Sequence, residues 1–276
     1  MINTEGFRLL ELKELQSMIL KAMKEIHSFC VENDIEYYII AGTMLGAVRH
    51  RGFIPWDDDI DIAMTRNNFE KFKHLFSTGK IANNYFLQDY STDKDFGLAL
   101  MRVCLPGTFQ NWPAQNHLRN CKNAYIDIFP LDNVPLKEEQ QRKQAKRIQT
   151  LNRICNLKLY RDYESKSFFA HFLKKTMHFL LKFISLRWLV TQKIKEMTKY
   201  DDVPCEYICS MQSHYSYSKQ MISKSIYGKP TLISFEDTQF YGPEMVNDYL
   251  SHLYGDYMRL PSEDKRPKPL DTYIAI

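Results

Sequence analysis

Apolar residues recur with two different periods along the chain, and these periods predict a mixture of helices and strands. Apolar side chains repeat every three or four residues over 8–33 and 67–76, as on the buried face of a helix. Short runs rich in β-branched and aromatic residues predict strands, which we place at 36–41, 59–64, 85–89, 98–104 and 124–129. Pro130 should end the last of these strands, because proline cannot donate to a sheet ladder. The pattern predicts an α/β (α+β) fold, a mixed sheet flanked by helices.

Two later helical patterns, at 137–160 and 166–199, are strongly basic. Residues 137–199 contain 16 Lys or Arg and 5 Asp or Glu, although the net charge of the whole chain is only +4. Lysines beside phenylalanines and Trp188 suit a helix that lies on an anionic membrane surface. The alternative is a helical layer that packs on the sheet and leaves a solvated basic face.

Composition narrows the class of protein. With 44 % hydrophobic and 25 % charged residues, the chain can form a packed core and is not wholly disordered. The six cysteines have no spacing typical of a disulfide framework, the N-terminus has no apolar signal segment, and no nucleic-acid-binding module is visible. We therefore expect a cytoplasmic protein, with peripheral contact with the inner face of a bacterial plasma membrane as a further hypothesis and no nucleic-acid partner. We divide it into a catalytic core at 1–136, a basic helical region at 137–200 and a C-terminal segment at 201–276 that packs back on the core.

The richest candidate chemistry lies just before and within the strand at 59–64. Four carboxylates fall within five residues, at Asp57, Asp58, Asp59 and Asp61. Because side chains alternate along a strand, Asp59 and Asp61 share one face, and Asp57 has the same parity. Carboxylates that converge repel one another until a cation neutralises them, and hard oxygen ligands suit Mg²⁺ or Mn²⁺. The alternative is a solvated acidic turn.

Asp127 repeats this pattern on the strand at 124–129, between two isoleucines. A carboxylate within an apolar strand is unfavourable unless it is paired or bound to a metal. If the two acidic strands are neighbours, Asp127 completes the metal site; otherwise it lies on the polar face of an edge strand. Asp132 is expected to be a turn or capping residue.

A turn at Gly42 and Thr43, between a strand and a short helix, could present backbone N–H groups and a hydroxyl to a phosphate. Arg49 and Arg51 lie between this turn and the carboxylates, where they could clamp phosphate oxygens or be ordinary surface arginines. A strand, a Gly-Thr turn and two acidic strands form the layout of a nucleotidyltransferase fold. In such a site two cations bridge a nucleoside diphosphate and align an attacking hydroxyl.

Three motifs resemble those of the LicD family of phosphotransferases, which is related to fukutin and the fukutin-related protein. The first and most specific is LGAVRHRGFIPWDDDIDIAM at 45–64, and IDIFPLD at 126–132 and YGDYMRLP at 254–261 follow in the expected order. The resemblance covers roughly 15–136 and 230–266. It departs after Arg266, where a histidine is expected and Pro-Lys-Pro follows.

The resemblance implies transfer of phosphocholine from CDP-choline to a sugar hydroxyl of a teichoic acid or lipopolysaccharide precursor that is assembled on a lipid carrier. By position, Asp57, Asp59 and Asp61 resemble the metal ligands and Asp127 the carboxylate of the third strand. Asp59, Asp61 and Asp127 are the catalytic candidates, and Asp127 is the best placed to take the hydroxyl proton. A quaternary ammonium binds to aromatic ring faces, so Trp56 and Trp112 are candidates for binding choline.

Three alternatives remain open from the sequence. The same chemistry could use another CDP-alcohol, such as CDP-ribitol or CDP-glycerol. The Asp-x-Asp pattern also occurs in glycosyltransferases that hold Mn²⁺ and a nucleotide sugar. A structural Ca²⁺ loop in a non-enzymatic binding protein is the third, although the Gly and the downstream Glu of such a loop are missing.

Overall fold

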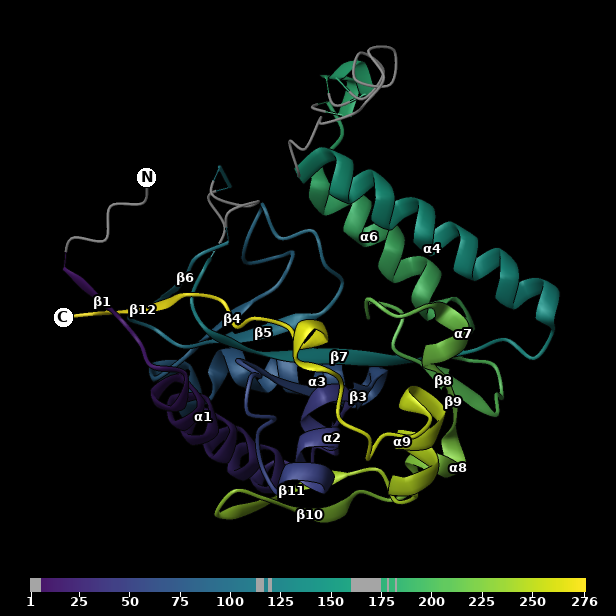
Figure 1. Cartoon of the computed structure of the whole chain (residues 1–276). Coiled ribbons are helices and arrows are strands. Elements are labelled where there is room, and N and C mark those ends of the chain that lie inside the picture. Colours follow the sequence, from purple (N-terminus) through teal and green to yellow (C-terminus); the bar gives the residue numbers. More distant parts are fainter. Residues whose placement is uncertain (1–5, 113–116, 119–120, 160–174, 178, 182) are drawn as a thin grey trace.

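The computed structural model describes residues 6–112, 117–118, 121–159, 175–177, 179–181 and 183–276 (Figure 1). At its centre is a mixed sheet with the strand order β2-β3-β7-β5-β4. These strands are β2 (Tyr38–Ile39), β3 (Ile60–Thr65), β7 (Tyr125–Asn133), β5 (Met101–Cys104) and β4 (Phe86–Gln88). The two central strands, β3 and β7, run parallel, and every other neighbouring pair in this order is antiparallel. The predicted α+β fold with a mixed sheet is confirmed.

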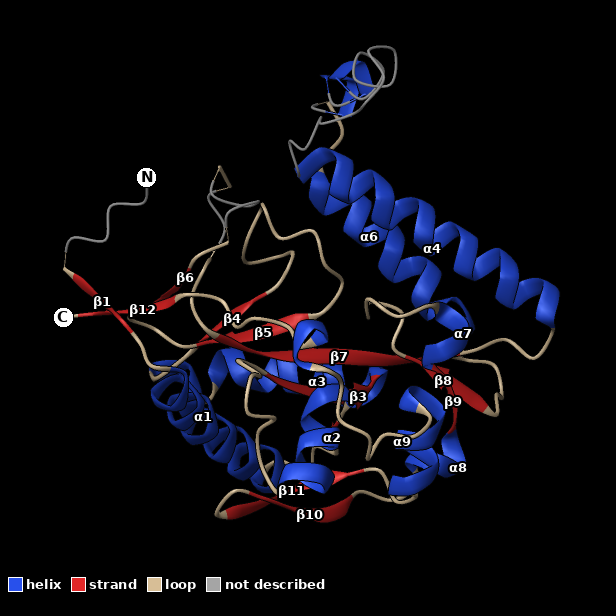
Figure 2. Cartoon of the chain, in the orientation of Figure 1, coloured by secondary structure: helices blue, strands red, loops and turns tan. Residues whose placement is uncertain are grey.

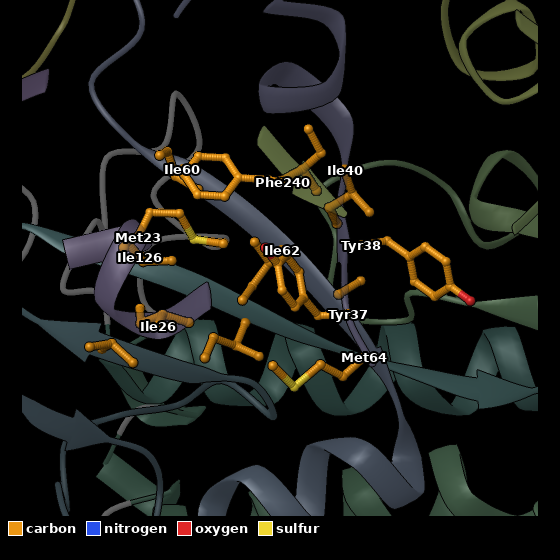
Figure 3. Close-up of a cluster of buried hydrophobic side chains, with 14 of the residues drawn as sticks. Met23, Ile26, Tyr37, Tyr38, Ile40, Ile60, Ile62, Met64, Ile126 and Phe240 are labelled. Atoms are coloured by element: carbon orange, nitrogen blue, oxygen red, sulfur yellow. The ribbon is translucent and has the colours of Figure 1, made fainter. Parts of the chain in front are cut away.

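Three helices of the first half accompany this sheet: α1 (Leu12–Glu32), α2 (Ala41–His50) and α3 (Arg66–Thr78). The apolar stripe that predicts α1 is buried, and its Met23 and Ile26 pack in one core with Ile62 of β3 and Ile126 of β7 (Figure 3). Since successive side chains of a strand point to opposite faces, the isoleucines occupy the core face and leave the other face to the aspartates.

Among its described residues, the basic region includes the helices α4 (Glu138–Leu159) and α6 (Leu186–Met197), which lie side by side at the edge of the molecule (Figures 1 and 2). Much of the predicted second helix, at 160–174, 178 and 182, lies outside the described residues. Within the described part, α6 starts only after Ser185, whose Oγ accepts the Trp188 N–H at 3.5 Å. The pattern at 166–199 is therefore not one continuous helix. Within the described ranges, no helix is both long and apolar enough to span a bilayer.

The remaining elements surround the central sheet. Strand β8 (Tyr207–Cys209) pairs with the end of β7 and with β9 (Met221–Ser223), and β10 (Thr231–Phe235) forms a hairpin with β11 (Thr238–Gly242). A separate three-stranded sheet has the order β1-β12-β6, and its strands are β1 (Phe7–Leu9), β12 (Thr272–Ala275) and β6 (Thr108–Gln110). The helices of this half are α7 (Tyr217–Gln220), α8 (Lys224–Tyr227) and α9 (Val246–Tyr254), and single 3₁₀ turns occur at Lys80–Asn83, Thr198–Tyr200 and Glu263–Lys265.

Two boundaries differ from the sequence prediction. The strand predicted at 36–41 is only two residues long, because α2 already begins at Ala41. Strand β7 continues through Pro130, which the sequence analysis took as its end. On one side of β7, β5 pairs only as far as Ile128 and β8 begins to pair at Asp132, so Pro130 lies in the gap between them, while on the other side β3 stays paired, with Met64 opposite Pro130. A missing N–H is tolerated on a side where no partner strand is present.

Candidate active site

The two acidic strands are neighbours, as expected. Asp61 of β3 and Asp127 of β7 are register partners in the parallel ladder, so both side chains leave the same face of the sheet. On the other side of β7, Arg102 of β5 is the register partner of Asp127. The middle of the sheet therefore carries a row of two carboxylates and one guanidinium.

A second group of carboxylates lies directly before β3. One oxygen from each of Asp57, Asp58 and Asp59 lies within 4.8 Å of the others. The alternation of side chains along a strand predicted that Asp57 lies with Asp59 and that Asp58 points away. This alternation does not apply at 57–59, because the strand begins only at Ile60. The chain leaves a turn at 55–56 and is not yet a strand at 57–59, and Asp58 joins the group. We call Asp57–Asp59 the acidic bend.

Burial and mutual repulsion hold protons on these groups. Burial, and after it the charge of Asp58, raise the pKa of Asp57 to about 6. For Asp59 and Asp61, burial raises the pKa well above its ordinary value, and the neighbouring carboxylates act in the same direction. Such a cluster stays partly protonated near neutral pH unless a cation takes the place of the protons.

Arg102 is a site residue that the sequence analysis missed. Its Nε donates to Asp127 Oδ1 at 2.7 Å, and its guanidinium carbon lies 3.7 Å from the ring centroid of Tyr125. Burial raises the pKa of Asp127, and Arg102 opposes this by favouring the ionised form. The signal in the sequence is a single arginine within an otherwise apolar strand, MRVC.

The predicted Gly-Thr turn lies against the carboxylates. Gly42 and Thr43 are in the first turn of α2, and Thr43 Oγ1 accepts the Asp61 N–H at 2.8 Å. A Cβ atom on Gly42 would lie 3.0 Å from Asp57 Oδ2. Glycine thus lets the acidic bend approach the start of the helix. Ala41, before it, has a left-handed φ of 47° and donates its N–H to the Tyr249 hydroxyl at 3.0 Å.

The two predicted arginine clamps have different surroundings. Arg49 Nη1 donates to the Tyr257 carbonyl at 3.0 Å, and Arg49 Nε lies 3.0 Å from His50 Nε2. Arg51 is exposed at the end of α2, with a left-handed φ of 61°. Arg49 therefore holds the C-terminal segment, and a phosphate role for either arginine stays a prediction.

The segment after α9 crosses the acidic bend. The Leu270 N–H donates to Asp58 Oδ2 at 2.7 Å, and the Arg266 guanidinium lies 4.6 Å from the ring centroid of Trp56. One ring face of Trp56 therefore already holds a cation, which is the contact a quaternary ammonium would make. Trp112 follows β6, and its indole N–H is directed to Gln110 Oε1 at 3.4 Å. Trp56 directly precedes the acidic bend in the chain, and a choline-binding role for either tryptophan stays a prediction.

Asp132 is not the turn or capping residue that was expected. It lies within β7, is fully buried, and accepts two hydrogen bonds from Arg66, at 2.7 and 2.8 Å. This two-point pair explains how the carboxylate is tolerated in the core.

Comparison with known proteins agrees with this geometry. Residues 34–150 match the family described as LicD/FKTN/FKRP, nucleotidyltransferase domain. Over 277 aligned residues the chain is 29 % identical to the lipopolysaccharide cholinephosphotransferase LicD of Haemophilus influenzae, covering 96 % of this chain and 98 % of that protein. An uncharacterised protein of Rickettsia typhi is 41 % identical over 69 residues, which are 25 % of this chain and 22 % of that protein. One of Rickettsia prowazekii is 50 % identical over 46 residues, 17 % of each.

The range that matches the family contains the acidic bend and both acidic strands, together with Arg102 and the Gly-Thr turn. Residues 34–150 are thus similar to the nucleotidyltransferase domain described for LicD, FKTN and FKRP, and nearly the whole chain is similar to the LicD of Haemophilus influenzae.

Proposed function

We propose that this protein is a phosphotransferase that moves phosphocholine from CDP-choline to a sugar hydroxyl of a cell-surface glycan precursor, such as that of a teichoic acid or lipopolysaccharide. The observation that carries the proposal is the convergence of the acidic bend with Asp61 and Asp127 beside the first turn of α2. The similarity to a lipopolysaccharide cholinephosphotransferase over nearly the whole chain supports phosphocholine as the transferred group.

The carboxylates fit Mg²⁺, or Mn²⁺ in its place. They offer only oxygen donors, and the three atoms of the acidic bend are close enough together to share one ion. Asp57, Asp59, Asp61 and Asp127 are the proposed ligands, and Asp58 joins them by its position. Bound Mg²⁺ offsets the charge of the diphosphate and polarises its oxygens.

The protein's own groups then position the reactants. The backbone of Gly42 and the first turn of α2 support the diphosphate, since the N-terminus of a helix favours anions. The sugar oxygen forms a bond to the phosphorus that bears choline, the bond from that phosphorus to the CMP oxygen breaks, and CMP leaves. Asp127, which Arg102 helps to keep ionised, takes the hydroxyl proton.

Trp56 is the proposed contact of the choline group. Its ring already carries the Arg266 guanidinium on one face, which supports its suitability for a cation.

Release of CMP from CDP-choline in the presence of Mg²⁺ and a sugar acceptor tests the proposal. We expect Asp59→Asn and Asp61→Asn to lower the rate by about a hundredfold or more, because each removes a ligand charge. Glu138→Gln, on the exposed face of α4, is the matched control and should be as active as wild type. Full activity in both aspartate variants would refute the assignment. Parallel reactions with CDP-ribitol, CDP-glycerol and a UDP-sugar identify the donor.

A cytoplasmic location with peripheral contact with the membrane is a separate proposal. Phe183 and Trp188 are 79 % and 54 % exposed, on a strongly basic part of the chain. Rings beside cationic side chains suit the surface of an anionic bilayer. The protein should sediment with phosphatidylglycerol vesicles, and Phe183→Ser with Trp188→Ser should weaken this. Equal sedimentation of wild type and the double variant would contradict the proposal.

A further inference from the structure

A large cavity lies outside the acidic site, between α4, α6 and the segment from β8 to α7. Its volume is about 960 Å³, which is in the range of sites for small molecules. Its walls carry side chains that can recognise hydroxyl groups: Gln149, Asn152, Asn156, Ser210, Ser213 and His214. None of the residues described as lining it is a carboxylate, whereas Arg142, Lys146 and Lys193 contribute positive charge. This chemistry suits a polyhydroxylated or phosphorylated ligand and does not suit choline, which is itself a cation.

The floor of the cavity is held rigid by a buried network. Lys193 Nζ donates to the Gly97 carbonyl at 2.7 Å, to Asn152 Oδ1 at 3.0 Å and to Gln212 Oε1 at 3.1 Å. The Ala99 N–H donates to the same Gln212 oxygen at 2.8 Å. These bonds join α4, α6 and two loops, so the cavity is preformed and not left by loose packing.

One polar group of this cavity has no partner. Ser210 is 2 % exposed and lines the cavity, and among the described residues its Oγ has no hydrogen-bond partner. A buried hydroxyl without a partner is unfavourable, because it has given up its hydrogen bonds to water. A ligand hydroxyl in the cavity could supply the missing hydrogen bond.

The cavity also adjoins the acidic site. Its lining residue Tyr215 makes an edge contact with Tyr254, with 6.2 Å between the ring centroids. Tyr254 is the last residue of α9, and the hydroxyl of Tyr249 in the same helix accepts the Ala41 N–H at the first turn of α2, which lies against the carboxylates. The two rings therefore connect the cavity to the helix that packs beside the acidic site.

From the cavity, the unpartnered serine and the contact with Tyr254, we infer that this cavity binds the glycan acceptor and directs one of its hydroxyl groups to the acidic site. This inference rests on the proposed phosphotransferase function, and it assigns the acceptor to residues of α4 and of the segment from Ser210 to Ser218.

Two variants test it by steady-state kinetics, with CDP-choline as donor and lipid-free lipopolysaccharide oligosaccharide as acceptor. Gln149→Trp places a large ring into the cavity from an exposed position of α4 and should raise the acceptor KM about tenfold or more. The donor KM should change much less than the acceptor KM. Thr150→Trp, one residue further and not in the lining, is the matched control and should leave both KM values unchanged.

Ser210→Ala separates binding from folding. Removing an unpartnered buried hydroxyl should leave the melting temperature equal or raise it, whether or not the hydroxyl binds a ligand. The acceptor KM separates the two cases: it should rise if Ser210 binds the acceptor and stay unchanged if it does not. An unchanged acceptor KM in both Gln149→Trp and Ser210→Ala would overturn it. Absence of CMP release from wild type would instead refute the proposed function itself.

Discussion

The repulsion within the acidic bend can be measured through the pH dependence of stability. Asp57 has a pKa of about 6 in the folded protein, against an ordinary value of 3.8, because burial and Asp58 disfavour its charge. The folded state therefore binds this proton more tightly than the unfolded state does. Between about pH 4 and pH 7 the metal-free wild type should lose stability as the pH rises. A shift of about two units corresponds to about 3 kcal/mol.

Asp57→Asn removes this dependence, since an amide does not titrate. In EDTA, we compare the free energy of unfolding of the variant with that of wild type at each pH. The difference, variant minus wild type, should increase by about 3 kcal/mol from pH 4 to pH 7. Urea denaturation across this range measures the difference, and the exposed Asp264→Asn serves as the control with no such trend. With Mg²⁺ at pH 7, wild type should be more stable than the variant, because only wild type keeps all the proposed metal ligands. A difference that stays constant with pH in EDTA would refute the electrostatic reasoning.

Three further variants test other parts of the account. Arg102→Met leaves Asp127 buried without its cation, so urea denaturation at pH 7 should show that the free energy of unfolding falls by about 3 kcal/mol. A fall below about 1 kcal/mol, which is on the order of an exposed ion pair, would contradict the role given to this pair. Gly46→Ala drives a methyl group into the Gly52 carbonyl, so unfolding should require about 1–3 kcal/mol less, and unchanged stability would contradict the close approach. Trp56→Ala should raise the KM for CDP-choline about tenfold and leave that for CDP-glycerol unchanged; an equal rise for both donors would show that Trp56 does not read the choline group.

Much of the fold could be predicted because its signals are local. The stripe of α1 and the isoleucines of β3 and β7 have the period of the element they form, and burial on one face leaves the aspartates on the other. The adjacency of Asp61 and Asp127 could be proposed from the matching alternation of their two strands. The short length of β2 and the continuation of β7 through Pro130 could not be predicted, because both depend on where neighbouring elements begin and end.

The missed residues of the site depend on tertiary structure in the same way. The lone arginine in the apolar strand MRVC is visible in the sequence, but the register that places Arg102 opposite Asp127 is set by the pairing of β5 with β7. Asp58 joins the acidic bend because the chain is not yet a strand there, so alternation does not apply. The contact between Arg266 and Trp56 joins residues more than 200 positions apart. Periodicity and motif spacing contain no information about such pairs.

The central claim is that the acidic bend, Asp61 and Asp127 hold the divalent cation that supports a CDP-alcohol. A crystal structure with Mn²⁺ and CDP-choline, read by the anomalous signal of manganese, tests it most directly. We expect the signal between the carboxylates of Asp57, Asp58 and Asp59, with the donor diphosphate beside Gly42. Manganese bound elsewhere, with these carboxylates free of metal while the nucleotide is present, would contradict the account.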